Sequence, residues 1–344
     1  MSRAPQRSVG PVLLERATME DVAAAAGVSP KTVSRVINLE PGVAAATVTR
    51  VHNAIAELGY RRNDLARNLR KGISLSSIGL VVESLANPLY AVAAQAVDEV
   101  ALRNGREILL TSSGGDPARE RQLVSDLLRH GVEGLLIVPT ADDYLFLEPD
   151  IRLGVRIVFM YQGTDTIGAD VVSIDNAGAS RRAVEHLTDY GHKRIAFIRN
   201  QTSFVSATGR CQGYRDAMSA AGLPVDETLV RAVPARAESA QAAVRRLMAD
   251  ADPPSAILSE NSSLSIGAVR AIRESSNRTA LVGFDDFELA DVLGISVVAC
   301  DPGEVGRVAA ELLFARLAGD SRPPQRIDVA TRLLARGSGE VLAV

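Results

Sequence analysis

Residues 29–35, with the sequence SPKTVSR, gather side chains that can recognise DNA. The cationic groups of Lys31 and Arg35 can donate hydrogen bonds to O6 and N7 of guanine in the major groove. The hydroxyl groups of Thr32 and Ser34 can bond phosphate oxygens and so fix the register of a protein on the duplex. Because the four side chains lie so close in sequence, one short helix would present them together.

The residues around this segment predict two short helices joined by a tight turn. Thr18 and Asp21 have the spacing of a capping box at the start of the first helix. Gly27 suits the left-handed position that ends it. Ser29 can then cap the second helix, and Pro30 suits its first turn. This is the layout of a helix-turn-helix motif, in which the first residues of the second helix meet base edges.

A third helix is predicted in the segment TVTRVHNAIAELGY. Its apolar residues Val48, Val51, Ile55 and Leu58 fall on one face and would close a three-helix core. The pattern alone leaves two interpretations open, namely a DNA-binding head or a helical hairpin with a solvated basic face.

Charge is distributed unevenly along the chain. The net charge is −3, yet residues 1–75 contain eleven Lys and Arg against six Asp and Glu, while the remainder contains 27 against 35. A small basic head on an acidic body favours contact with nucleic acid through the head alone. The two cysteines lie far apart and the chain shows no metal-ligand spacing, which fits a reducing compartment and predicts no bound metal. No apolar run is long enough to cross a bilayer, and residues 1–16 form a poor signal peptide, so we expect a flexible tail and a cytoplasmic protein.

From about residue 76, short apolar strands alternate with amphipathic helices. This alternation predicts an α/β core of two doubly wound parallel-sheet subdomains with a ligand cleft beyond the carboxyl ends of the strands. The segment VVSIDNAGAS, at 171–180, is expected to cross between the two halves. The predicted strands have the sequences SIGLVV, EILLTS, GLLIVP, RIVFMY, IAFIR, SAILS and ALVGF.

Three segments together resemble the LacI/GalR family of bacterial transcription regulators: DVAAAAGVSPKTVSRVIN, AIAELGY and RNDLARNLRKG. The resemblance extends over nearly the whole chain after the tail. It implies a helix-turn-helix domain at 17–62, a hinge helix and linker at 63–75, and a periplasmic-binding-protein-like core at 76–344. The core would bind an effector and dimerise, and its chain would cross between subdomains near 175, 302 and 326.

The resemblance also assigns residues to DNA. Pro30, Lys31 and Arg35 match base-contacting positions, and Leu69 matches a leucine that wedges into the minor groove at the centre of the operator. Apolar wedges of this kind kink DNA. Two departures from the family are Arg62, which replaces a proline before the hinge, and Pro30, which cannot donate a hydrogen bond. The residues expected to contact DNA are Thr18, Ser29, Pro30, Lys31, Thr32, Ser34, Arg35, Asn38, Asn63, Ala66 and Leu69.

The same resemblance implies a small-molecule effector, sugar-like in character, in the cleft. Arg210 is a natural clamp for vicinal hydroxyls or a carboxylate. Leu89 replaces one family aromatic, and Ser262 replaces a family aspartate, so no particular sugar follows from the residues. The residues expected to bind effector are Asn87, Tyr90, Tyr161, Arg210, Asn261 and Asp285.

Other functional classes fit less well. The sequence has no phosphate-binding glycine loop, no nucleophile elbow and no His/Cys cluster, so we expect no enzymatic activity, no catalytic residue and no cofactor. An extracytoplasmic sugar-binding protein would need an export signal and no basic head. The interpretation adopted is a dimeric repressor that binds a pseudo-palindromic operator in double-stranded DNA and does not bind membranes. An effector-independent architectural protein, or a regulator with a non-sugar effector, stays open as an alternative.

Overall fold

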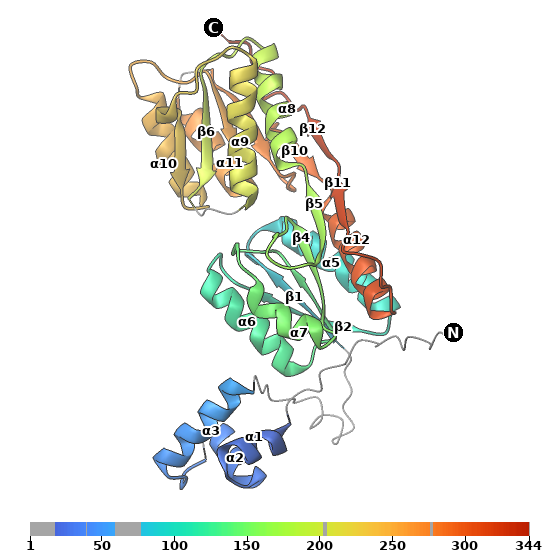
Figure 1. Ribbon diagram of the computed structural model, residues 1–344. Helices are drawn as coiled ribbons and strands as arrows, with labels where there is room; N and C mark the ends of the chain where they lie inside the picture. Colours follow the sequence, from blue (N-terminus) through green and yellow to red (C-terminus); the bar gives the residue numbers. More distant parts are fainter. Residues whose placement is uncertain (1–17, 39, 59–76, 202–204, 276–277, 344) are drawn as a thin grey trace, which may run out of the picture.

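The computed structural model describes residues 18–38, 40–58, 77–201, 205–275 and 278–343. Three helices at the amino-terminal end form a small body of their own (Figure 1). They are α1 (Met19–Ala26), α2 (Pro30–Ile37) and α3 (Ala45–Glu57). The predicted tail at 1–16 and the predicted hinge, with Arg62, Asn63, Ala66 and Leu69, lie outside the described residues.

Local signals in the sequence set the ends of these helices. The Thr18 hydroxyl accepts a hydrogen bond from the Asp21 amide, and the Asp21 carboxylate accepts one from the Thr18 amide, so the predicted capping box is confirmed. Gly27 ends α1 with a φ of 62°, and the Ser29 hydroxyl caps α2 by accepting from the Thr32 amide. The core of the head contains Val22, Ala23, Ala26, Val33, Val36, Val51 and Ala54.

One residue of the predicted helical face does not join this core. Leu58 is 40% exposed, because α3 ends at Glu57 and Leu58 is its C-cap, so this prediction was wrong. Val48 and Ile55 pack against the core at its edge, as predicted.

The first sheet of the core has the strand order β11-β5-β4-β3-β1-β2, with all neighbours parallel. Its strands are β1 (Ser77–Val82), β2 (Glu107–Ser112), β3 (Gly134–Ile137), β4 (Arg156–Tyr161), β5 (Asp170–Ile174) and β11 (Arg326–Val329). One face packs on α5 (Pro88–Arg103) and α12 (Pro302–Leu317), and the other packs on α6 (Pro117–His130) and the short helices η1 (Leu145–Leu147) and α7 (Glu148–Arg152).

The second sheet repeats this plan with the order β12-β10-β9-β8-β6-β7. Its strands are β6 (Ile195–Asn200), β7 (Val230–Val233), β8 (Ala256–Ser259), β9 (Ala280–Phe284), β10 (Ser296–Cys300) and β12 (Thr331–Leu334). Helices α8 (Asn176–Asp189) and α9 (Val205–Ala220) cover one face, and α10 (Ala237–Met248) and α11 (Ser262–Glu274) cover the other. A turn of 3-10 helix, η2 (Glu227–Leu229), precedes β7. The two doubly wound parallel-sheet subdomains of the predicted fold are therefore present, and only the pair β10–β12 is antiparallel among the described ladders.

The chain passes between the subdomains three times, along one side of the molecule (Figure 1). It leaves the first sheet after β5 at Asp175, and it returns after β10 at Asp301 to begin α12. The third passage lies at Ala330, between β11 and β12, where a crossing near 326 was expected.

A buried ion pair ties the end of α12 to the starts of β5 and β11, at the end of these elements away from the passages. The guanidinium of Arg316, in α12, donates two hydrogen bonds of 2.8 Å to the Asp170 carboxylate at the start of β5. Both residues are less than a tenth exposed, and the Gln325 amide just before β11 also donates to Asp170. Removing one partner of a buried, hydrogen-bonded pair typically costs about 3–5 kcal/mol, so this contact holds α12, β5 and β11 together.

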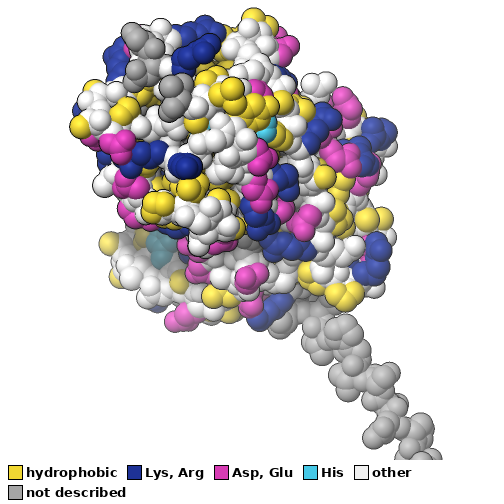
Figure 2. All heavy atoms as spheres, turned by 90° about the horizontal axis from the view of Figure 1, so that it is seen from above, with side chains coloured by type: hydrophobic (Ala, Val, Ile, Leu, Met, Phe, Trp, Pro, Cys, Tyr) yellow, Lys and Arg dark blue, Asp and Glu magenta, His cyan; other side chains and the backbone are white. Residues whose placement is uncertain are grey.

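The surface of the core carries mixed charge. Seen from the end occupied by the second subdomain, basic and acidic side chains are interspersed (Figure 2). No described helix is both long enough and apolar enough to span a membrane.

Candidate functional sites

A pocket of about 140 Å³ lies where the carboxyl ends of the strands of both sheets face each other. All six side chains predicted to bind a small molecule line it, namely Asn87, Tyr90, Tyr161, Arg210, Asn261 and Asp285. Ligands of open α/β sheets bind at this position, outside the carboxyl ends of the strands. The structure thus brings together residues that are spread over some 200 positions of the sequence.

Arg210 is the central donor of this pocket. Its guanidinium donates to the Asn176 side chain at 2.8 Å, to the Glu260 backbone carbonyl at 2.5 Å, and to the Asp285 carboxylate at 3.4 Å. It also lies over the Phe284 ring, with Cζ 4.1 Å from the ring centroid. Arg210 is only 7% exposed, so it is buried in the pocket wall and does not form a surface ion pair.

Two pocket residues have an unusual backbone. Tyr161 and Asp285, directly at the ends of β4 and β9, have φ values of 66° and 64° and are the only described non-glycine residues with positive φ. Such conformations cost about 1–3 kcal/mol each and concentrate at functional sites. In this chain they lie across one pocket from each other, on different subdomains.

Two glutamates in the pocket were not foreseen from the sequence. Glu83 follows β1 and accepts a 3.0 Å hydrogen bond from the Tyr90 hydroxyl, and Glu260 follows β8 and accepts a 2.6 Å bond from the Asn200 amide. Burial raises the pKa of Glu83, and burial raises the pKa of Glu260 to about 7. The signal that could have found them is a charged residue placed directly after a continuous apolar strand.

The two asparagines have a local role as well. The Asn87 side chain caps α5 by accepting from the Leu89 amide, and the Asn261 side chain caps α11 by accepting from the Leu264 amide. Both still line the pocket, so the amino ends of two helices point their amides toward it. Leu89 and Ser262, the two positions near this pocket at which the chain departs from the family pattern, are both buried.

The second candidate site is the outer face of α2 in the head. Lys31 is exposed at its first turn, beside Ser29 and Pro30, and Thr32 is partly covered by the Ser29 hydroxyl. Arg35 is engaged within the head, since it donates a 2.6 Å hydrogen bond to the Pro41 carbonyl and lies 3.5 Å from Glu40. The remaining predicted residues on this face, Ser34 and Asn38, are joined side chain to side chain, and Thr18 caps α1.

Comparison with known proteins agrees with this arrangement. Residues 18–63 match the family described as "Bacterial regulatory proteins, lacI family", and residues 184–339 match "Periplasmic binding protein-like domain". The HTH-type transcriptional regulator CelR of Thermobifida fusca is 34% identical over 337 residues, which cover 94% of this chain and 98% of CelR. The chain belongs to the LacI family.

Solved structures of the family have the same architecture. A structure titled "transcriptional regulator CelR-cellobiose complex" matches with a TM-score of 0.68 and 33% identity over 94% of this chain and 100% of that one. The lac repressor dimer bound to operator and the anti-inducer ONPF matches with a TM-score of 0.70 and 26% identity over 96% and 100%. This LacI-family chain is accordingly a DNA-binding transcriptional regulator.

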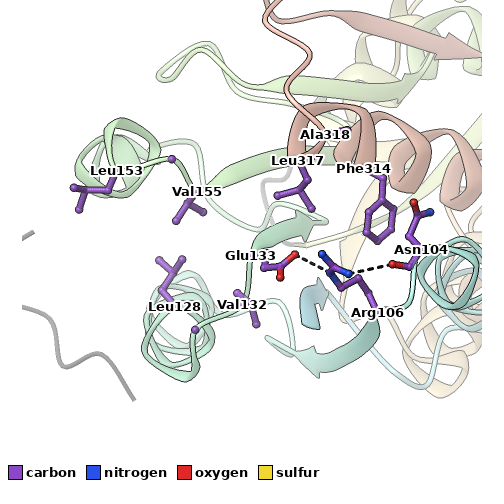
Figure 3. A pocket seen from close by; sticks show the side chains of 12 residues that line it. Asn104, Arg106, Leu128, Val132, Glu133, Leu153, Val155, Phe314, Leu317 and Ala318 are labelled. Atoms are coloured by element: carbon purple, nitrogen blue, oxygen red, sulfur yellow. Dashed lines mark hydrogen bonds and ion pairs between the residues drawn. The ribbon is translucent and has the colours of Figure 1, made fainter. Parts of the chain in front are cut away.

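A larger hollow, of about 550 Å³, lies at the opposite, amino-terminal edge of the first sheet (Figure 3). An ion pair of 2.8 Å between Arg106 and Glu133 lies at its side, and Phe314 and Leu317 of α12 extend into it. None of the residues predicted to bind effector lines this hollow. Within the described part of the chain, no cluster of three or more His, Cys, Asp or Glu side chains could hold a metal ion.

Proposed function

We propose that this regulator is a repressor whose affinity for its operator is controlled by a hydroxyl-rich, sugar-like molecule bound in the pocket between the subdomains. The observation that carries the proposal is the composition of that pocket. The first subdomain contributes Asn87, Tyr90 and Tyr161, and the second contributes Arg210 and Asp285. A ligand held by both sets of residues has different contacts whenever the subdomains move, which is what an allosteric effector requires.

The side chains of the pocket suit a sugar-like ligand. Carboxylates, amides and a guanidinium can bond hydroxyl groups, while the rings of Tyr90 and Tyr161, edge to face at 5.7 Å, offer an apolar surface. The complex of CelR with cellobiose gives this assignment further support. A volume of about 140 Å³ is below the roughly 300 Å³ at which drug-sized pockets begin, and it favours a ligand of about one sugar ring.

We assign the DNA contacts to the outer face of α2 and to the hinge segment. Lys31, exposed at the start of α2, donates to a base edge, and Arg35 exchanges its contact with the Pro41 carbonyl for a base or phosphate. Thr18, Ser29, Thr32, Ser34 and Asn38 fix the register on the phosphates. The proposed domains are a helix-turn-helix domain at 17–62, a hinge and linker at 63–75, and a core at 76–344.

We further propose that two copies act together on a pseudo-palindromic operator. The edge strand β2 exposes the neighbouring side chains Leu109 and Leu110, 38% and 40% exposed, and the preceding helix α5 exposes Leu102 near its end. Exposed apolar side chains on an unpaired strand edge are suited to cover by another subunit. The operator-bound lac repressor is itself a dimer.

The coupling of the two sites obeys reciprocity. If effector weakens operator binding two-hundredfold, operator must weaken effector binding by the same factor, and the coupling free energy is about 3 kcal/mol. The three passages at Asp175, Asp301 and Ala330 are the covalent links through which the subdomains can move relative to each other. We assign no enzymatic activity to the pocket.

The experiment is a selection of genomic fragments by the purified protein at physiological salt, with and without a panel of sugars, polyols and sugar phosphates. We expect one short palindrome to be retained without ligand and released by one member of the panel. Equal retention of all fragments with a steep salt dependence would favour an architectural protein instead. Retention of one palindrome that nothing in the panel releases would contradict the sugar-like effector.

A further inference from the structure

The pocket contains more buried negative charge than its cation can balance. Three carboxylates line it, those of Glu83, Glu260 and Asp285, against the single guanidinium of Arg210. Glu260 and Asp285 are each 5% exposed. Burying a carboxylate away from water is costly unless a positive group or several hydrogen-bond donors compensate it.

Arg210 is already committed to other partners. Its direct carboxylate contact is Asp285, and two more of its five N–H groups donate to Asn176 and to the backbone carbonyl of Glu260. The nearest further cation, Arg199 in β6, donates to the carbonyl of Asn200 and does not line the pocket. Among the described residues no ion pair is formed by the side chain of Glu83 or Glu260, although both feel the field of Arg210.

A second observation concerns the hydroxyl of Tyr161 in the pocket wall. The hydroxyl of Tyr161 is fully enclosed and has no hydrogen-bond partner among the described residues, although the residue is 94% buried and lines the pocket. Its ring packs edge to face on Tyr90, the donor to Glu83. Buried hydroxyls are nearly always paired, and among the side chains with an unpaired buried atom in the described residues Tyr161 is the one that lines this pocket, which makes its hydroxyl a candidate partner for a polar group of a ligand.

We propose that the effector is a hydroxylated molecule that carries a protonated amine, of the amino-sugar class, with the ammonium group held by Glu83 and Glu260. This inference rests on the proposed function and names the ligand of the same pocket more closely. The ammonium donates to the two glutamates and neutralises the excess negative charge. The rings of Tyr90 and Tyr161 add the cation–π attraction that ammonium groups obtain from aromatic faces. Ring hydroxyls bond Asp285, Arg210 and the free hydroxyl of Tyr161.

A neutral sugar would satisfy this pocket less well. Its hydroxyl groups can donate to carboxylates, but they leave the repulsion between the carboxylates of Glu83, Glu260 and Asp285 uncompensated. A hydroxyl that donates to a carboxylate already forms a charge-assisted hydrogen bond, so what an ammonium group adds is its positive charge. The charge balance therefore discriminates between two ligands that differ only in an amine and a hydroxyl.

The test compares matched pairs of ligands by titration calorimetry on the full-length protein. The amines are glucosamine, galactosamine and mannosamine, and the partners are glucose, galactose and mannose, each differing from its amine at one carbon. N-acetylglucosamine serves as the uncharged derivative. We expect at least one amine to bind about tenfold more tightly than its parent sugar, and the acetylated compound to lose that preference.

Variants then assign the preference to the glutamates. Glu83→Gln and Glu260→Gln should each weaken binding of the preferred amine about fivefold or more while changing binding of the parent sugar about twofold or less. Glu185→Gln, at an exposed position of α8, is the matched control and should change neither. The charge proposal is overturned if no amine outbinds its parent, or if both glutamine variants keep the full preference.

The same proteins separate this inference from the proposed function. If a neutral sugar releases the operator and amines are not preferred, the proposed repressor function is supported. Only the proposal that the ligand carries an ammonium group is then contradicted. An amine that binds as expected while the operator stays bound would support the charge of the pocket and contradict effector control of DNA binding.

Discussion

Replacing Glu260 by glutamine should make the ligand-free protein more stable, and increasingly so as the pH rises. The Glu260 carboxyl is 5% exposed at the end of β8, and burial raises its pKa from an ordinary value of 4.5 to about 7. An acid with a raised pKa in the folded state binds a proton there at a pH where the unfolded chain has lost it. Its contribution to stability is therefore complete below about pH 4.5 and is lost as the pH rises to about 7.

The magnitude follows from the pKa difference. A shift of about 2.5 units at roughly 1.36 kcal/mol per unit gives about 3 kcal/mol by which ionised Glu260 destabilises the fold above neutral pH. Glutamine has the same shape, and its carbonyl oxygen can still accept the hydrogen bond from the Asn200 amide. The variant avoids the ionisation cost and retains that contact, so we expect a gain of up to about 3 kcal/mol at pH 8 and of roughly 1 kcal/mol or less at pH 5.

The assay is urea unfolding of wild type and Glu260→Gln between pH 5 and pH 8, at one protein concentration because a dimer's stability depends on it. The slopes of the two proteins must agree, so that the midpoints report stability. Glu185→Gln, exposed on α8, controls for the loss of a charge and should show a difference that is small at every pH. A difference between Glu260→Gln and wild type that does not grow with pH would refute the argument that Glu260 is a costly buried acid.

Four further outcomes are expected. Lys31→Ala should relax base preference at one symmetric pair of operator positions by roughly 1–3 kcal/mol per contact, and unchanged selectivity in a binding-site selection would exclude Lys31 from base contact. Leu69→Ala should reduce specific binding far more than non-specific binding in mobility-shift assays, and equal losses would contradict a minor-groove wedge. Asp285→Ala should abolish release of the operator by effector while operator affinity is kept; normal release would show that the effector site has been misplaced. Leu110→Glu should dissociate the dimer in sedimentation experiments and weaken operator binding, whereas an intact dimer would show that β2 is not the contact surface.

Polarity explains some of the strands that the sequence predicted and some of those that it missed. Segments such as 77–82 and 134–137 are buried on both faces and consist almost entirely of apolar residues. The missed strands β7, β11 and β12, with the sequences VRAV, RIDV and TRLL, lie at sheet edges and have mixed polarity. Two further strands, β5 and β10, were also missed, although both are buried along their whole length. The pairing of β11 and β12 is decided by tertiary contacts with strands far away in the sequence, which short-range patterns do not contain.

The residues of the pocket also include some that were predicted before the structure was known and some that were not. Family resemblance predicted the positions of Arg210 and Asp285, because those positions recur in a fold whose ligand site is fixed at the strand ends. It did not predict Glu83 or Glu260, since a resemblance reports what members share, whereas these carboxylates are recognised from their burial and from the pKa changes that burial causes.

The backbone conformation of the pocket could not be predicted from the sequence either, and it affects how the ligand is recognised. A positive φ at Tyr161 or Asp285 has no local cause, since neither tyrosine nor aspartate prefers it as glycine does. The conformation must be imposed by the sheets on either side, at a cost of about 1–3 kcal/mol per residue. The surrounding structure that imposes this backbone also places Tyr161 and Asp285 in the pocket wall before a ligand arrives. The positions of pocket residues such as Arg210 and Asp285 could therefore be predicted from the family. The charge balance of the pocket and the orientation of its groups could be recognised only in the folded structure.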